Sequence, residues 1–181
     1  MSAPPLPDLS KYNPKNSFYL TSTAIIIKNN RILIVKRSPN EKAFPNKWTL
    51  PGGKLEIEEY INRPTDGVNQ WYNILEDSLR REVVEETGLT MKTLNYLCSL
   101  VFIRPDNIHV VVLSMYADYD SGEVKLSDEL TDHAWVTLEE AKNYDSIEGI
   151  YDELVVLDKK LKGDTSEPCE QRKIHVSPKR N

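Results

Sequence analysis

Three glutamates near the end of one predicted helix, Glu82, Glu85 and Glu86, are the residues whose spacing points most directly to chemistry. Leu75 and Leu79 mark the inward face of this helix, and the same face continues at i+7 and i+11 with Glu82 and Glu86. Glu85 lies beside both, so three negative charges crowd one side of a turn with side-chain origins roughly 5 to 6 Å apart. Left alone, these carboxylates would repel one another.

The place of the glutamates within the helix adds to this repulsion. They occupy the last two turns before Gly88, where the helix dipole disfavours each negative charge by roughly 0.3 to 1 kcal/mol. A hard divalent cation such as Mg²⁺ prefers carboxylate and carbonyl oxygens, and it would convert the repulsion into binding. We therefore infer a metal site.

The alternative to a metal site is a solvated acidic face paired with Arg80, Arg81 or Lys92, which is the usual outcome for a glutamate-rich helix. Two features favour the metal. The acidic positions follow the apolar register of the same helix, and a Gly-Gly loop precedes it that could bring backbone carbonyls close to a cation.

Local signals place the acidic helix at residues 74–87. Asn73 can cap the first turn, Glu76 three residues later completes a capping-box pattern, and Gly88 supplies a left-handed stop. Just upstream, residues 51–53 (Pro-Gly-Gly) predict a tight loop in which chemistry can sit.

Strand-rich segments flank this helix on both sides. The expected strands cover residues 18–28, 31–37, 48–50, 91–104, 109–119 and 135–137. Asn29 and Asn30 predict one hairpin turn, and residues 105–107 predict another. A helical turn at 138–142 and an amphipathic closing helix at 147–161 complete the order of strands, helix, strands, helix.

Length and composition fit one folded domain. The chain has 181 residues, of which 39% are hydrophobic and 28% charged, values that are ordinary for a globular protein with its own core. Prolines at positions 4, 5, 7 and 14 indicate an extended N-terminal lead-in, and the polar C-terminal stretch indicates a flexible tail. We expect a lead-in over 1–16, a domain over 17–162 and a tail over 163–181.

Charge and location signals restrict the partners. The formal net charge of -5 argues against a long nucleic acid as partner, so a small anionic substrate would need local Lys and Arg side chains or a bound cation. Cys98 and Cys169 are expected to be reduced thiols that bind no zinc. Because the first residues do not resemble a secretory signal and no apolar run approaches transmembrane length, we expect a cytoplasmic protein without membrane contact.

Two segments around the acidic helix match a known signature, which reads Gly, five residues, Glu, seven residues, then Arg-Glu-U-x-Glu-Glu-x-Gly-U with U a bulky apolar residue. REVVEETGL at 81–89 supplies the second half, and PGGKLEIEE at 51–59 supplies the first, with Gly53 and Glu59 correctly separated. The flanks KRSPNEKAFPNKWTLPGGKLE and DELTDHAWVTLEEA extend the likeness over about residues 22–161. The sequence thus resembles the Nudix hydrolase family of MutT-like pyrophosphohydrolases.

The resemblance implies the α/β class and the Nudix α/β/α sandwich, with a mixed, curved β-sheet between helices. The chain departs from the signature in one respect. The family pattern would put the motif arginine at position 67, which is Gly67, whereas the arginine is Arg81, so fourteen extra residues intervene. This insertion, within residues 60–72, predicts a loop extruded between the glycine segment and the helix.

The resemblance also implies roles for the site residues. The metal ligands for Mg²⁺, with Mn²⁺ as the alternative ion, would be the Gly52 carbonyl, Glu82, Glu85 and Glu86. Glu82 would coordinate the ion or position a water, and Arg81 would hold the carboxylate of Glu59. The reaction is attack of water on phosphorus, for which the metal neutralises charge and lowers the pKa of a bound water while a carboxylate accepts the proton.

Further candidates lie outside the signature. Glu129 stands six residues before Trp135, as does an additional metal ligand or base in some relatives, although a solvated loop acid beside Asp128 is an equal alternative. Arg37 could meet a substrate phosphate, with Lys36 as the competing choice, and either could be a solvated strand end. The substrate-binding candidates are Lys36, Arg37, Gly53 and Lys54.

The substrate implied by the resemblance is a nucleoside diphosphate linked to another group. The compact plan resembles members that act on free nucleotides, so a modified nucleoside triphosphate giving the monophosphate and pyrophosphate is the first expectation. ADP-ribose, NADH and dinucleotide polyphosphates are the alternatives. Pro105, sixteen residues beyond Leu89, has a spacing associated with ADP-ribose cleavage, but it also sits where a hairpin turn needs a proline, and the turn is the stronger interpretation. A homodimer is left open as the oligomeric partner.

Two other interpretations remain beside the enzyme. A non-catalytic nucleotide-sensing module often loses motif carboxylates, whereas all three are present here, which favours hydrolysis. RNA cap removal would call for a basic RNA-binding surface that the acidic composition does not suggest. Large aromatic residues could stack on a base, yet such residues are more often core or lid residues; they are Phe44, Trp48, Trp71 and Trp135.

Overall fold

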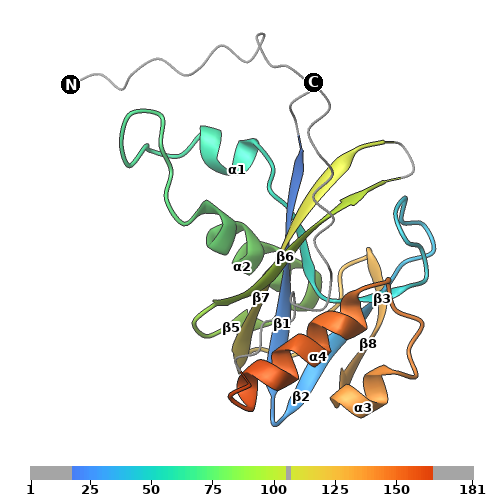
Figure 1. The fold of residues 1–181 in the computed structure, drawn as a ribbon. Helices are drawn as coiled ribbons and strands as arrows, with labels where there is room; N and C mark the ends of the chain where they lie inside the picture. Colours follow the sequence, from blue (N-terminus) through green and yellow to red (C-terminus); the bar gives the residue numbers. More distant parts are fainter. Residues whose placement is uncertain (1–17, 105–106, 165–181) are drawn as a thin grey trace, which may run out of the picture.

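The computed structural model describes residues 18–104 and 107–164. In chain order the elements are β1 (Tyr19–Lys28), β2 (Arg31–Arg37), β3 (Trp48–Thr49), β4 (Gly52–Lys54), α1 (Glu58–Ile61), α2 (Ile74–Thr87), β5 (Thr90–Met91), β6 (Asn95–Ile103), β7 (His109–Ser121), β8 (Leu130–Val136), α3 (Leu138–Ala141) and α4 (Ile150–Leu161) (Figure 1). The expected N-terminal lead-in, most of the expected tail, Pro105 and Cys169 lie outside the described residues.

The strands form one mixed sheet. Its central path is β3-β2-β1-β7-β5, and β4 pairs with β1, β6 with β7, and β8 with β2. β1 and β7 run parallel over nine residue pairs, from Tyr19 opposite Val110 to Ile27 opposite Asp118, whereas the neighbouring pairs are antiparallel. Because β1 and β7 are far apart in the chain, this central pair joins the two halves of the domain.

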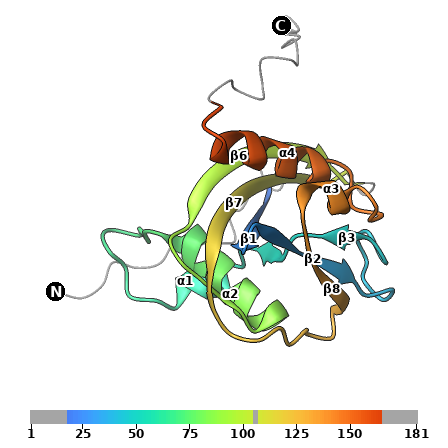
Figure 2. The ribbon, with the colours of Figure 1, turned by 90° about the horizontal axis from the view of Figure 1, so that it is seen from below.

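Helices cover both faces of the sheet. Side chains along each strand alternate between these faces, so β1 and β2 each contribute to two core clusters. On one face Ala24 and Ile26 of β1 pack with Leu79 and Val83 of α2. On the other face Ile25 packs in a second core cluster with residues of α4, including Leu154 and Leu157. Figure 2 shows the strands lying between α2 and α4. The expected α/β/α sandwich is confirmed.

The turn between β1 and β2 and the end of α2 are present where local sequence signals predicted them. Asn29 and Asn30 have φ values of 51° and 59°, as the tight turn between β1 and β2 requires. α2 has the predicted bounds and ends at Gly88, whose φ is 71° and whose N–H donates to the Val84 carbonyl at 2.8 Å. These features depend on neighbouring residues alone, which is why the sequence predicts them.

The predicted capping box at the start of α2 was wrong. Asn73 makes no side-chain capping hydrogen bond and instead adopts a left-handed backbone with φ of 56°. The chain enters the helix from the inserted segment, and asparagine tolerates the left-handed turn that this entry requires. Asn73 therefore contributes its backbone conformation rather than a cap.

The glycine segment also differs from its prediction as a tight loop. Gly52–Lys54 form strand β4, antiparallel to Thr21, Ser22 and Thr23 of β1. A Cβ at Gly52 would lie 2.2 Å from the Ser22 carbonyl oxygen, so the close approach of the two strands requires glycine. Elsewhere the predicted strand 91–104 divides into β5 and β6, the short strand expected at 135–137 extends over β8, and the closing helix starts at Ile150 rather than at residue 147.

Candidate active site

Side chains of the second half of α2 contact the backbone of the glycine strand β4. A Cβ at Gly53 would lie 2.2 Å from the Glu82 carboxyl carbon, so that carboxylate rests directly on the glycine. The Gly52 N–H donates to Glu86 Oε2 at 2.8 Å. Two of the three motif glutamates therefore contact the glycine strand, which fixes their distance from the sheet.

Arg81 donates hydrogen bonds to three carboxylates, two from α2 and one from α1. Its Nη2 donates to Glu59 Oε1 at 2.7 Å and to Glu82 Oε1 at 2.6 Å, and its Nη1 donates to Glu85 Oε2 at 2.6 Å. The contact with Glu59 is the one that the resemblance implied, and it forms despite the insertion. One guanidinium thus neutralises part of the charge of three acidic side chains.

The insertion folds as a separate projection before α2. It begins with the short helix α1, and Tyr60 packs against Trp71 with ring centroids 5.2 Å apart. Arg63 pairs with Asp77 of α2 at 2.8 Å, which fastens the projection to the first turn of that helix. In Figure 1 the segment between α1 and α2 lies at the N-terminal end of α2. The Glu59–Arg81 hydrogen bond forms further along the helix, so the extra residues leave it intact.

Burial and charge shift the pKa values of the site carboxylates in opposite directions. The pKa of Glu86 is raised to about 8, chiefly by burial and also by the nearby Glu82 and Glu129 carboxylates, which together outweigh the lowering by the Gly52 N–H and Arg37. Burial also raises the pKa of Glu82. Burial acts in the same sense on Glu59, but there the Glu56 N–H and Arg81 prevail and hold the pKa below its usual range.

The donor set fits a hard divalent cation by its chemistry. Glu82, Glu85 and Glu86 supply carboxylate oxygens from adjacent turns, and the buried Glu86 lacks a charged side chain within hydrogen-bond distance among the residues that the structure describes. Their present arrangement is nevertheless not a ligand cage, because no three acidic, His or Cys side chains of the described segments converge on one point. Arg81 binds one oxygen of Glu82 and one oxygen of Glu85.

Glu129 lies next to this cluster, as the sequence predicted. The Ser127 N–H donates to the Glu86 carbonyl at 3.1 Å, and the Ser38 N–H donates to the Glu129 carbonyl at 2.8 Å. These bonds hold the segment before β8 against the end of α2, and Glu129 is near enough to raise the pKa of Glu86. The structure thus brings together the motif carboxylates and the extra candidate acid.

The basic candidates separate between the two faces of the sheet. Lys36 pairs with Trp48, which packs on the α4-side core cluster, whereas the charge of Arg37 acts on Glu86 on the α2 side. The pairing of β2 with β8 shifts register between these two residues. Arg37 lies on the α2 face, where its charge reaches Glu86, although its side chain also pairs with Glu41 and donates to the Ala43 carbonyl. Lys36 and Lys54 lie on the α4 face, away from the carboxylates, and Lys54 pairs with Glu56 at 2.9 Å.

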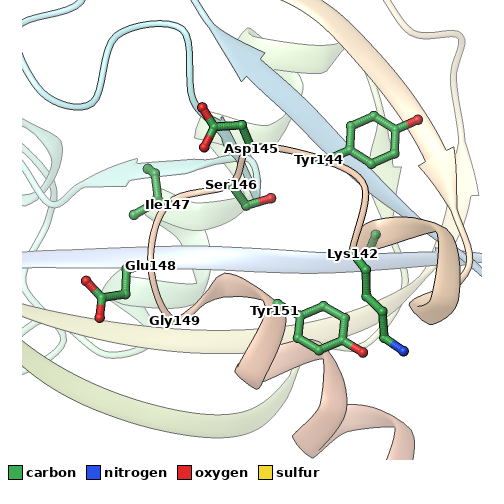
Figure 3. Close-up of a pocket in the computed structure, with 9 residues that line it drawn as sticks. Lys142, Tyr144, Asp145, Ser146, Ile147, Glu148, Gly149 and Tyr151 are labelled. Carbon is green, nitrogen blue, oxygen red and sulfur yellow. The ribbon is translucent and has the colours of Figure 1, made fainter.

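An open hollow of about 330 Å³ lies between α3 and the start of α4, separate from the carboxylates. Its lining includes Lys142, Tyr144 and Tyr151, and Figure 3 shows Lys142 beside Tyr151. Lys142 is paired with Glu139 at 2.8 Å. None of the candidate catalytic residues lines this hollow, so it lies apart from the candidate active site.

Each aromatic residue that the sequence singled out packs against another ring. Trp48 contacts Tyr144 and Trp135 contacts Tyr119, in edge-on pairs with centroids 4.7 and 6.2 Å apart. Phe44 contacts Phe102 at 6.1 Å. Sequence reasoning did not find Phe102, because only the pairing of β6 with β7 and β1 puts it beside the other ring-bearing residues.

Comparison with known proteins identifies the domain. The model of the NUDIX domain matches residues 19–155. The chain is 28% identical over 132 residues to the nucleoside triphosphatase NudI of Klebsiella pneumoniae (strain 342), covering 67% of this chain and 83% of the relative. It is 32% identical over 125 residues to an ADP-ribose pyrophosphatase of Methanocaldococcus jannaschii, covering 67% of this chain and 63% of the relative.

A solved structure has the same fold. The MutT protein of Methanosarcina mazei Go1 superposes with a TM-score of 0.63 and 26% sequence identity, covering 80% of this chain and 96% of the other. Within the described segments, no helix has the length and apolar character needed to cross a membrane. The domain match, the fold and the carboxylate cluster on α2 show that the chain belongs to the Nudix family of hydrolases.

Proposed function

We propose that this protein uses Mg²⁺ to hydrolyse the diphosphate bond of a nucleoside diphosphate derivative, and that its substrate is a modified nucleoside triphosphate, cleaved to the monophosphate and pyrophosphate. The observation that carries the proposal is the cluster of Glu82, Glu85 and Glu86 against Gly52 and Gly53. The similarity to a nucleoside triphosphatase over most of that relative's length supports the choice of substrate.

The site residues would have separate roles in this reaction. Glu82, Glu85 and Glu86 would hold the cation, with Mn²⁺ as an alternative, and the carbonyl of Gly52 would add an oxygen. A bound divalent cation supplies charge neutralisation and a water of lowered pKa. Glu129 would accept a proton, and its charge acts on Glu86, which supports this role.

Two arginines support this arrangement. Arg81 keeps the Glu59 carboxylate ionised and would retain it when Glu82 and Glu85 bind the cation. Arg37 lies on the same face and would stabilise negative charge on the substrate. The small nucleotide-type partner is thus held by charge from the protein and from the cation together.

Cleavage of ADP-ribose is the second candidate, because the Methanocaldococcus jannaschii relative bears that activity in its name at 32% identity. Both reactions break a diphosphate bond, so the same carboxylates serve either one. The difference lies in the group attached beyond the second phosphate.

Mass spectrometry of the products tests both candidates. The protein is incubated with nucleoside triphosphates, oxidised triphosphates, ADP-ribose, NADH and dinucleotide polyphosphates, each with Mg²⁺ and with a chelator. We expect a triphosphate to yield a monophosphate and pyrophosphate only when Mg²⁺ is present. Cleavage of ADP-ribose to AMP and ribose phosphate in preference to every triphosphate would select the second candidate, and binding without cleavage would contradict both.

A further inference from the structure

The strands at the two sides of the sheet differ in how they are protected. β8 pairs with β2 and β6 pairs with β7, and each has one side without a partner strand among the described residues. Such an edge can pair with a strand of another chain, and charged side chains usually prevent this. β8 has the exposed residues Thr131, Asp132 and His133. β6, with the sequence NYLCSLVFI, has no charged residue, proline or glycine.

The first part of β6 is nevertheless protected. The Lys160 Nζ donates to the Tyr96 carbonyl at 2.9 Å, and the pairing of β6 with β7 shifts register between Tyr96 and Cys98. A lysine and a bulge are two of the devices that block the addition of a strand. Neither of them extends to residues 99–103, which we call the open edge.

The pairing with β7 determines which main-chain groups of the open edge point outward. At the end of the hairpin the Arg104 N–H donates to the Ile108 carbonyl at 2.9 Å. In an antiparallel pair, residues that bond to the partner strand alternate with residues whose N–H and C=O groups point away from it. Counting back from Arg104, the outward groups belong to Ser99, Val101 and Ile103.

The side chains of the open edge are also available for contact. Val101 is 58% exposed and Ile103 is 59% exposed. They lie on the α2 face, but α2 packs farther along the sheet, against Ala24 and Ile26. In Figure 1 the hairpin of β6 and β7 extends past the helices. Burial of these aliphatic side chains against another surface would be favourable.

A second copy of this chain matches the open edge in its hydrogen-bonding groups. Antiparallel pairing about a two-fold axis at Val101 places Val101 opposite its own copy and Ser99 opposite Ile103 of the second copy. Both members of each pair point their N–H and C=O groups outward, so each pair exchanges both main-chain hydrogen bonds.

Charge and symmetry also favour a second copy as the partner. Because β6 has no charged residue, no like charges of this strand meet across the axis, although the chain has a net charge of -5. A two-fold contact uses the open edge of both copies at once. The assembly therefore closes as a dimer and does not grow into a fibre.

We propose that residues 99–103 form an interface at which two copies of this protein pair as antiparallel strands, so that their sheets join into one. This interface would account for the homodimer that the sequence left open. A stable interface of standard size contains roughly 20 to 30 residues from each partner. Because the open edge is much shorter, the dimer should be weak and should dissociate on dilution.

Sedimentation velocity at protein concentrations from about 10 μM to 1 mM tests the dimer. We expect the unaltered protein to change from monomer to dimer over this range. Val101→Lys places like charges opposite each other at the axis and should raise the Kd of the dimer by about 10-fold or more. Val101→Pro removes an outward N–H without removing a bond to β7, and it should have the same effect. A monomer at every concentration would overturn the proposal.

His133→Lys is the matched control, because it adds the same charge at an exposed position of the other edge strand, β8. This variant should dimerise like the unaltered protein. Thermal unfolding checks that each variant is folded, and Ile103→Lys offers a second exposed position if either Val101 variant is not. Unchanged dimerisation in the folded open-edge variants would place the interface elsewhere and overturn the proposal.

Hydrogen exchange of single amides tests whether the contact is a strand pairing. The amides of Ser99, Val101 and Ile103 should exchange more slowly as the protein concentration rises, whereas the Leu100 amide, which points to β7, should be slow at every concentration. Dimerisation without slower exchange at the three amides would overturn the strand pairing. Slow exchange that does not depend on concentration would show that the same chain covers the edge, and it would also overturn the proposal.

Discussion

Gly53 lies against Glu82 so closely that a Cβ at this position would stand 2.2 Å from the Glu82 carboxyl carbon. The glycine strand and the acidic helix therefore pack without room for one further carbon atom at Gly53. Gly53→Ala should force the carboxylate or the helix to move, because the neighbouring Gly52–Glu86 contact leaves little freedom. We expect the Kd for Mn²⁺, measured by electron paramagnetic resonance, to rise by roughly 10- to 100-fold.

The control for this variant is Gly67→Ala, since Gly67 has no left-handed φ and a Cβ there would meet only the flexible Gln70 side chain, at 3.0 Å. That variant should bind Mn²⁺ like the unaltered protein. Unchanged Mn²⁺ affinity in Gly53→Ala would show that Glu82 is not held by the glycine.

Arg81 is the counter-ion of three carboxylates, those of Glu59, Glu82 and Glu85. Arg81→Gln should therefore destabilise the protein in EDTA, lowering Tm by roughly 2 to 10 °C, because it leaves acidic groups without their charged partner. Mg²⁺ should restore part of the loss, since the cation replaces the missing positive charge. Calorimetry with and without Mg²⁺ measures the difference; an equal Tm deficit in both conditions would contradict this role.

The raised pKa of Glu86 predicts opposite pH trends for the metal-free and metal-bound protein. Because burial raises this pKa from 4.5 to about 8, its contribution to folding is fully present below pH 4.5 and is lost as pH rises towards 8. Cation binding needs the ionised carboxylate, so the affinity for Mg²⁺ should increase over the same interval.

Thermal unfolding from pH 5 to 9, in EDTA and in Mg²⁺, measures both trends. Glu86→Gln should flatten the pH dependence in EDTA, because glutamine does not titrate. An Mg²⁺ affinity that does not change between pH 5 and 8 would contradict the assignment of Glu86 as a ligand.

Glu153 is a buried carboxylic acid with a structural role on the α4 face. It accepts a hydrogen bond from the Ser114 hydroxyl at 2.6 Å, which joins α4 to β7. Glu153→Ala should lower the free energy of unfolding by about 1 to 3 kcal/mol, because it leaves the Ser114 hydroxyl without this partner and opens a gap. Urea denaturation measures this change. Asp152→Ala, on the exposed side of the same helix, should have little effect.

Local patterns predicted the acidic helix and its ligand candidates, because the Gly88 stop signal, helix periodicity and motif spacing depend on nearby residues, whereas the Asn73 capping box failed where the insertion enters the helix. α2 has its predicted bounds, and Glu59 and Arg81 meet although the insertion separates them. The pairing of β1 with β7 joins residues about ninety positions apart, and no local pattern reveals it. That pairing is what places Tyr19 in line with Phe102.

Sequence patterns also could not decide which basic residue, Lys36 or Arg37, faces the carboxylates. Arg37 and Lys36 are adjacent and equally charged, and only their contacts on the two covered faces separate them. Similarly, the Pro-Gly-Gly segment favours a turn by composition, whereas tertiary pairing with β1 makes it a strand. In both cases the deciding contact is distant in sequence.

The most direct test of the metal-dependent hydrolase is turnover of its best substrate as a function of Mg²⁺ concentration, compared between the unaltered protein and Glu86→Gln. Groups that only orient metal ligands are worth about 10- to 100-fold, so loss of a ligand should reduce kcat/KM by at least about 100-fold. Glu139→Gln, an exposed acid in α3 with a side chain 82% accessible, should retain full turnover. Full Mg²⁺-dependent turnover by Glu86→Gln would contradict the site.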